Sequence, residues 1–281
     1  MTIGIVTDST CDLPDSLAAT LGIGIVPLYI NFGKESYLDG IQMSRRAFYE
    51  RLAVGSVHPT TAVPGLGVFG KAYADLAAAG ATAIVSIHVG ERLSNVVTVA
   101  RMAADDNPPV PVTVVDSGNL TLGVGLMALR AAELSKAGGS LDDILSTVQD
   151  LRKRTYCFAA LSTLEFMRRS GRISWLQAGL GGWLQVKPIL KMHDGAVSTE
   201  RVRTRPKAVQ RLIDLVTELG PLSDLMVVHT NAPDEAARLR QNTAYLFPAG
   251  REPLTAQVTP VIGAHIGPGV VGFVAVAAKA G

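Results

Sequence analysis

The sequence predicts a two-domain α/β protein, with a parallel sheet in the first domain and a mixed sheet in the second. In the first half, short apolar runs alternate with amphipathic stretches, which is typical of a parallel sheet covered by helices. In the second half, Asp194-Gly195 separates two alternating runs, which indicates a β-hairpin. A chain of 281 residues also has the length for two modest domains. We place the boundary at about residue 157, giving domains 1–157 and 158–281.

Four strands and six helices are expected in the first half. The strand segments are nearly all apolar, as expected when helices cover both faces of the sheet. The strands are placed at 3–6, 24–28, 83–88 and 112–115. The helices are placed at 14–21, 44–53, 67–79, 94–104, 122–137 and 141–155. Polar clusters follow the first and fourth strands, so this edge of the sheet is the expected ligand site.

The second half is expected to form a mixed sheet with two helices. The hairpin strands are placed at 186–191 and 196–203, and three further strands at 225–229, 254–261 and 270–278. The helices are placed at 206–219 and 232–245. The stretch 253–278 contains no Asp, Glu, Lys or Arg, but its three prolines exclude a membrane-spanning helix.

Composition narrows the class of function. Hydrophobic residues make up 48% of the chain and charged residues 18%, so the excess apolar surface either covers sheets or receives a ligand. A formal net charge of +2 argues against nucleic-acid binding. Two cysteines and five histidines without paired spacing give no metal site, and no cofactor is expected. The N-terminus has no basic region or cleavage site, so we expect a cytoplasmic, soluble protein.

Two segments carry candidate functional residues. Ser94 lies at the start of a predicted helix, where a hydroxyl and free amides suit an anion, although an ordinary helix cap explains it equally well. His265 lies in the segment 263–269, which is rich in glycine and which we expect to be a loop between two strands. A simple turn does not require a histidine, so a functional role is favoured there.

These segments resemble the DegV family, which includes the FakB fatty-acid-binding subunits of bacterial fatty acid kinase. The resemblance rests first on Thr7-Asp8-Ser9-Thr10-Cys11-Asp12-Leu13-Pro14 and on Gly263-Ala264-His265-Ile266-Gly267-Pro268-Gly269. It covers the whole chain in the same motif order. The other matching motifs are Tyr37-Leu38-Asp39-Gly40, Leu93-Ser94, Val114-Val115-Asp116-Ser117, Leu164-Glu165, Gly171-Arg172-Ile173, Lys187-Pro188-Ile189-Leu190 and Val202-Arg203-Thr204-Arg205.

The resemblance implies a three-layer α/β/α N-terminal domain, a second α/β domain and a buried tunnel between them that holds a long-chain fatty acid. It implies that Thr61, Ser94 and His265 bind the carboxylate. Asp8, Ser9, Asn95 and Gly267 are expected to support this site. The imidazole of His265 could act as a cation or as a neutral donor.

The resemblance also implies partners. The carrier has no catalytic residues of its own and presents the carboxylate to a separate fatty acid kinase subunit, which forms an acyl phosphate. Arg172 and Arg203 are assigned to docking with that partner or, transiently, with a membrane surface, and surface ion pairs are the alternative.

The chain departs from the family pattern beside the site residues. Ala62, Val63 and Gly65 replace polar residues after Thr61, and Asn95 and Val96 follow Ser94 where a glycine and a threonine are usual. These changes bear on ligand identity more than on the fold.

Two rival functions stay open. One is a serine hydrolase or esterase that uses Ser94 with His265, oriented by Asp116 or Asp8, although the chain has no GxSxG segment. The other is a protein that binds a different carboxylate or phosphate metabolite.

Overall fold

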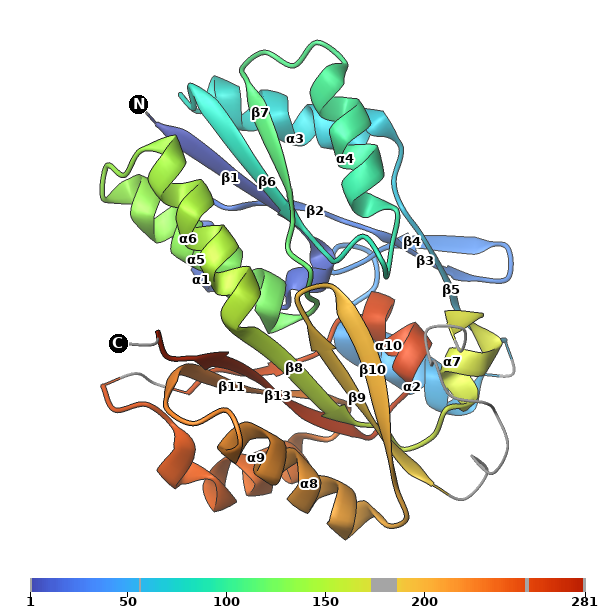
Figure 1. Cartoon of the computed structure of the whole chain (residues 1–281). Helices are drawn as coiled ribbons and strands as arrows, with labels where there is room; N and C mark the ends of the chain where they lie inside the picture. Colours follow the sequence, from blue (N-terminus) through green and yellow to red (C-terminus); the bar gives the residue numbers. More distant parts are fainter. Residues whose placement is uncertain (1, 56, 173–185, 251–252, 280–281) are drawn as a thin grey trace.

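The first sheet is parallel and has the strand order β2-β1-β6-β7 (Figure 1). The computed structural model describes residues 2–55, 57–172, 186–250 and 253–279. The strands are β1 (Ile3–Asp8), β2 (Gly24–Val26), β6 (Ala83–His88) and β7 (Val112–Asp116). Every residue of β1 and β6 is buried, because helices cover both faces of the sheet.

Helices on opposite faces of this sheet confirm the three-layer arrangement. α3 and α4 pack on one face, and α5 packs on the other, with α1 and α6 beside it. The helices are α1 (Asp15–Leu21), α3 (Leu66–Ala78), α4 (Val96–Asp105), α5 (Leu122–Lys136) and α6 (Leu141–Arg154). Ser140 caps α6 with a capping box, in which Asp143 returns the hydrogen bond.

The second sheet is mixed, with the order β10-β9-β8-β13-β11-β12. Its strands are β8 (Thr155–Ala160), β9 (Lys187–His193), β10 (Ala196–Val202), β11 (Leu222–Thr230), β12 (Thr255–Gln257) and β13 (Val270–Ala277). Neighbours are antiparallel except β11 and β12, which are parallel. One face packs against α8 (Arg205–Thr217) and α9 (Pro233–Asn242), which η4 (Ala244–Leu246) follows, and the other packs against α5 and α6.

α5 lies between the two sheets, and its composition explains the position. The helix contacts β1 and β6 of the first sheet and β8 and β13 of the second. Its residues are buried on almost every side, as expected for a helix that is apolar all round. The division of the chain at residue 157 stays a prediction, because α5 packs against both sheets.

A third, antiparallel sheet was not predicted from the sequence. It consists of β3 (Tyr29–Phe32), β4 (Glu35–Leu38) and β5 (Thr60–Ala62), in the order β4-β3-β5. α2 (Arg45–Val54) follows β4. Gly33, with φ of 62°, begins the two-residue turn between β3 and β4, and this turn was the available sequence signal. The predicted strand 24–28 stops at Val26.

Two expectations in the second half are wrong. β8, in the middle of the second sheet, was not predicted, because the helix 141–155 runs into it without a break in the sequence. The predicted strand 254–261 is a strand only over β12, and the helix α10 (Pro260–Ile266) follows. Pro260 at the first helical position favours this helix start. His265 therefore lies in the last turn of α10 and not in a loop.

The remaining described elements are short. They are the 3-10 turn η1 (Ser9–Cys11) and the helix α7 (Glu165–Arg169). Across the parts of the chain that the structure describes, no helix combines the length and apolar character that crossing a membrane requires.

Candidate functional site

A cavity of about 620 Å³ lies at the carboxyl ends of the strands of the first sheet. The segments that follow β1, β2, β6 and β7 line one side of it. β5, α4, α10, the hairpin β9–β10, and α7 with the segment after it line the rest. Most of the lining side chains are apolar, and the volume is in the usual range for a small-molecule site.

The cavity brings together the three residues assigned to the carboxylate. Thr61, Ser94 and His265 all line it, although they come from β5, the segment before α4, and α10. Thr61 Oγ1 lies 3.0 Å from His265 Nε2. Asn95, a predicted supporting residue, also lines the cavity.

Ser94 is not a helix cap. α4 begins at Val96 and Asn95 occupies the cap position, so Ser94 lies one residue outside the helix. Within the described parts of the chain, its hydroxyl makes no hydrogen bond. The hydroxyl is therefore available to a ligand, at the N-terminal end of a helix where backbone dipoles favour an anion.

His265 is neutral in this environment. Burial, with the positive charge of Arg172 and the nearby His58, lowers the pKa of His265 to about 3. Its Nδ1 is buried and has no partner among the described residues. When Nε2 carries the proton, it donates to Thr61, and the Thr61 proton is free for an anion. His265 thus orients Thr61 as a neutral group.

Arg172 lines the cavity, which differs from its expected place on a docking surface. It is half-buried, and its Nη1 donates to Ser170 O at 2.8 Å. Arg203, predicted for the same role, is exposed just beyond the end of β10 and does not line the cavity. Ile173, the last residue of the motif with Arg172, lies outside the described residues.

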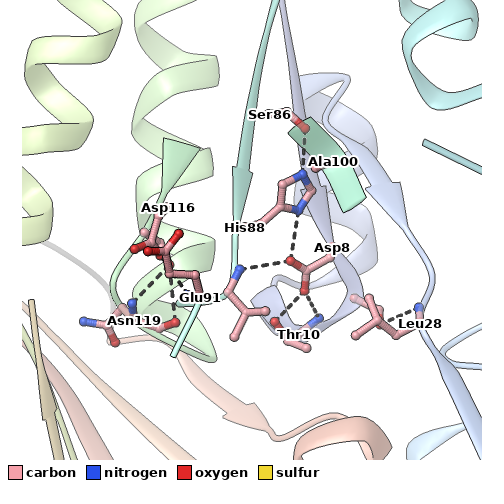
Figure 2. A network of polar contacts seen from close by, with 12 residues as sticks. Asp8, Thr10, Leu28, Ser86, His88, Glu91, Ala100, Asp116 and Asn119 are labelled. Carbon is pink, nitrogen blue, oxygen red and sulfur yellow. Dashed lines mark hydrogen bonds and ion pairs between the residues drawn. The ribbon is translucent and has the colours of Figure 1, made fainter. Parts of the chain in front are cut away.

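Asp8 does not line the cavity but holds a residue that does. Its carboxylate accepts hydrogen bonds from Thr10 N, Thr10 Oγ1, Val89 N and His88 Nδ1 (Figure 2). Burial alone would raise the pKa of Asp8, but the hydrogen bond and charge of His88 bring it below its ordinary value. Thr10 also lines the cavity, and it belongs to the polar cluster after the first strand that was expected to mark the ligand edge of the sheet.

The other two supporting residues also act from outside the cavity. Ser9 donates to Asp39 Oδ2 at 2.7 Å and accepts from Leu28 N at 3.2 Å. Gly267 ends α10 with φ of 76°, and a Cβ there would lie 2.3 Å from the Phe166 ring. Glycine is therefore required where the chain leaves the helix that carries His265.

A serine, a histidine and an aspartate form a second array beneath the cavity. Ser86 Oγ lies 2.6 Å from His88 Nε2, and His88 Nδ1 lies 3.0 Å from Asp8 Oδ2 (Figure 2). All three side chains are fully buried, and Ser86 also contacts Tyr73. None of the three side chains lines the cavity, and the array links the ends of β1 and β6.

The geometry does not assemble the rival hydrolase site. His265 Nε2 contacts Thr61 and not Ser94. Asp116 binds the backbone amides of Glu91 and Gly118, and Asp8 binds His88, so neither orients His265. Over the same described ranges, no three His, Cys, Asp or Glu side chains are grouped as metal ligands would be.

The fold and site define an α/β protein with two large sheets and one small one, whose largely apolar cavity is lined in part by hydroxyl, imidazole and guanidinium groups. The family model described as "Uncharacterised protein, DegV family" matches residues 2–278, and the chain belongs to this family.

Relatives match over nearly the full length. A DegV domain-containing protein of Streptomyces coelicolor is 36% identical over 276 residues, 97% of each chain. Protein DegV of Bacillus subtilis is 32% identical over 97% of this chain and 98% of its own.

Solved structures share the fold. The DegV family protein of Thermus thermophilus, described in terms of fatty acid binding, superposes with a TM-score of 0.89 at 35% identity, over 99% of this chain and 100% of its own. DegV of Bacillus subtilis, described as a fatty acid binding protein, has a TM-score of 0.89 at 30% identity over the same shares.

Proposed function

We propose that this protein binds a long-chain fatty acid in the cavity and presents its carboxylate to a separate fatty acid kinase. The observation that carries the proposal is that Thr61, Ser94 and His265 all line one mainly apolar cavity of about 620 Å³. Full-length relatives that bind fatty acids support it.

The apolar lining supplies most of the binding free energy. Burying ~14 methylene groups at about 0.8 kcal/mol each gives roughly 11 kcal/mol of gross transfer free energy. A membrane offers the chain a similar gain, so contacts with the carboxylate must help to retain the ligand. Two hydroxyls and the cation of Arg172 are suited to this, since charge-assisted hydrogen bonds are the stronger kind.

The carboxylate would lie near the surface. Glu91, Arg92 and Asn95 are exposed and line the cavity beside Ser94, so the cavity opens there. A kinase could reach the carboxylate at this opening. One carboxylate oxygen would attack the terminal phosphorus of a nucleoside triphosphate held by the kinase, and the diphosphate would leave. This chain then contributes binding and orientation, not catalysis.

Extraction of the purified protein tests the binding step. Native mass spectrometry followed by solvent extraction should find a co-purifying C14–C18 fatty acid. A protein that carries no acyl chain and binds no added long-chain acid in calorimetry would refute the proposal. Binding of a short carboxylate metabolite in its place would favour the other ligand class.

Two further assays test the remaining steps. A serine-directed fluorophosphonate should not label Ser94, and labelling that disappears in Ser94→Ala would establish the hydrolase. With a fatty acid kinase added, the bound acid should become an acyl phosphate, trapped as its hydroxamate. Failure with a kinase that is active on another DegV-family carrier would refute presentation to that kinase while leaving binding intact.

A further inference from the structure

Two buried carboxylates hold the end of α10 opposite to His265. Thr259 immediately precedes the helix, and its backbone N–H donates to Asp12 Oδ1 at 2.7 Å. The Thr259 hydroxyl donates to Asp39 Oδ2. Asp12 is 2% exposed and Asp39 is 3% exposed. The start of α10 is thus tied to side chains from two distant segments of the first half of the chain.

The small sheet β4-β3-β5 holds α10 at both ends. Asp39 directly follows β4, and Thr61 lies in β5. At one end of the helix Asp39 binds Thr259, and at the other Thr61 lies 3.0 Å from His265 Nε2. A helix rises 1.5 Å per residue, so six residues separate the two ties by only about 9 Å. A displacement at Thr259 is therefore transmitted to His265.

Close packing leaves α10 little freedom to adjust. Gly263 lies in the middle of the helix, and a Cβ at this position would come within 2.5 Å of Tyr49 Oη. The Tyr49 hydroxyl donates to Val258 O at 3.1 Å, just before Thr259. The side of α10 that faces α2 is thus fixed by packing. The position of the helix along its other side then depends on the hydrogen bonds of Thr259.

We propose that Asp39, together with Asp12, is a positioning residue for carboxylate recognition: it places His265 against Thr61 by holding Thr259, and its ionisation weakens binding of the ligand. This inference rests on the proposed fatty-acid site and adds a pH-dependent control to it.

The charges around the two carboxylates explain why ionisation is expected to weaken ligand binding. Arg45 Nη2 lies 3.3 Å from Asp12 Oδ1, and its charge also acts on Asp39. Asp39 Oδ1 and Arg45 Nε are buried without a hydrogen-bond partner among the described residues. The other groups that face the cluster add little positive charge, since they are Asp8 of β1, Asp15 of α1 and Tyr49 of α2.

Ionisation of both carboxylates is costly in this place. Burial raises the pKa of Asp39 to about 6, although hydrogen bonds from Thr259 and Ser9 oppose the shift. Burial also raises the pKa of Asp12 to about 7, against the charge of Arg45. As the pH rises, both carboxylates become charged beside the single guanidinium of Arg45. Water that enters to solvate the second charge would weaken the hydrogen bonds that hold Thr259.

Asp39→Asn tests the inference. The amide oxygen can still accept from Ser9 and Thr259, but the side chain cannot ionise. Calorimetry would measure the Kd of a long-chain fatty acid at pH 5.5 and pH 8 for both proteins. Comparing the two proteins at each pH cancels the ionisation of the ligand itself. From pH 5.5 to pH 8, the wild-type Kd should rise relative to that of the variant, by up to about tenfold for a coupling of one pKa unit.

A second pair of variants separates positioning from folding. Thr259→Val removes the hydroxyl bound to Asp39 and should reduce the preference for a fatty acid over the matching alcohol, whereas Thr259→Ser should restore it. Asp224→Asn is the matched control, because Asp224 is a buried carboxylate that binds Arg130 and does not line the cavity. This control should leave both the preference and its pH dependence unchanged.

The outcomes distinguish failure of the positioning role of Asp39 from failure of the proposed fatty-acid binding. If the wild type binds fatty acid and Asp39→Asn keeps the wild-type pH dependence, the positioning role is wrong while the proposed function stands. Retention of the acid preference in Thr259→Val contradicts the positioning role in the same way. If the wild type binds no fatty acid, the proposed function itself fails, and this inference fails with it.

Discussion

Thr61→Val should weaken the binding of a long-chain fatty acid far more than the binding of the matching alcohol. Valine has nearly the same shape as threonine and lacks only the hydroxyl that lies 3.0 Å from His265 Nε2. When the neutral His265 carries its proton on Nε2, it donates to Thr61 and leaves the Thr61 proton for a carboxylate. A hydrogen bond to a charged group contributes about 1.5–3 kcal/mol, against about 0.5–1.5 kcal/mol for a neutral pair.

In affinity terms, the expected loss for the acid is roughly 10- to 150-fold. Isothermal titration with palmitic acid and with hexadecanol measures both losses on the same protein. Thr60→Val is the matched control, because Thr60 neighbours Thr61 in β5 but is exposed and does not line the cavity. This control should leave both affinities unchanged.

An equal loss for acid and alcohol would show that Thr61 shapes the cavity and does not recognise the carboxylate. An unchanged affinity for both would place the carboxylate elsewhere. Either result would refute the assignment of Thr61 and the neutral role given to His265.

The remaining predictions concern charge, packing and pH. Arg172→Ala should weaken fatty-acid binding at least severalfold in calorimetry, whereas Arg203→Ala should affect only coupling to a kinase. Equal affinities of the two variants for the fatty acid would favour the docking role for Arg172. Gly263→Ala should destabilise the fold by about 1–3 kcal/mol in urea unfolding, because the new methyl overlaps the Tyr49 hydroxyl, and Tyr49→Phe should recover part of this loss. The native pKa of Asp39 is above its ordinary value of 3.8, so its ionisation lowers the stability of the wild type as the pH rises from about 4 to 6. The unfolding free energy of Asp39→Asn relative to wild type should therefore increase over that window. A constant difference between the two proteins would contradict this.

Much of the fold follows from local patterns. The strands β1 and β6 are buried along their whole length, and their continuous apolar runs predict this directly. The hairpin β9–β10 follows from Asp194-Gly195, both of which have positive φ. α10 was missed because its small and apolar residues read equally well as a buried strand. What decides for a helix is Pro260 at its start and the room that Gly263 leaves beside Tyr49.

The site was predictable in part. Thr61, Ser94 and His265 were selected from a resemblance and from local sequence, and the structure brings all three to one cavity. The place of Arg172 in the cavity wall was not predictable, because neither its charge nor its neighbours indicate which way the side chain faces. Thr10 was expected only as part of the polar cluster after the first strand and was not assigned to the ligand individually.

By itself, the sequence determined the α/β class and most of the strands of both larger sheets, whereas the assignment of three residues to the carboxylate came from a resemblance and stays a prediction. Only the tertiary structure decided which polar groups meet in the interior. Asp39 and Thr259 are 220 residues apart, and Thr61 and His265 are 204 apart. The physical reason is that hydrophobic periodicity records how deeply each segment is buried, whereas a buried carboxylate takes its partners and its pKa from whatever the fold places beside it.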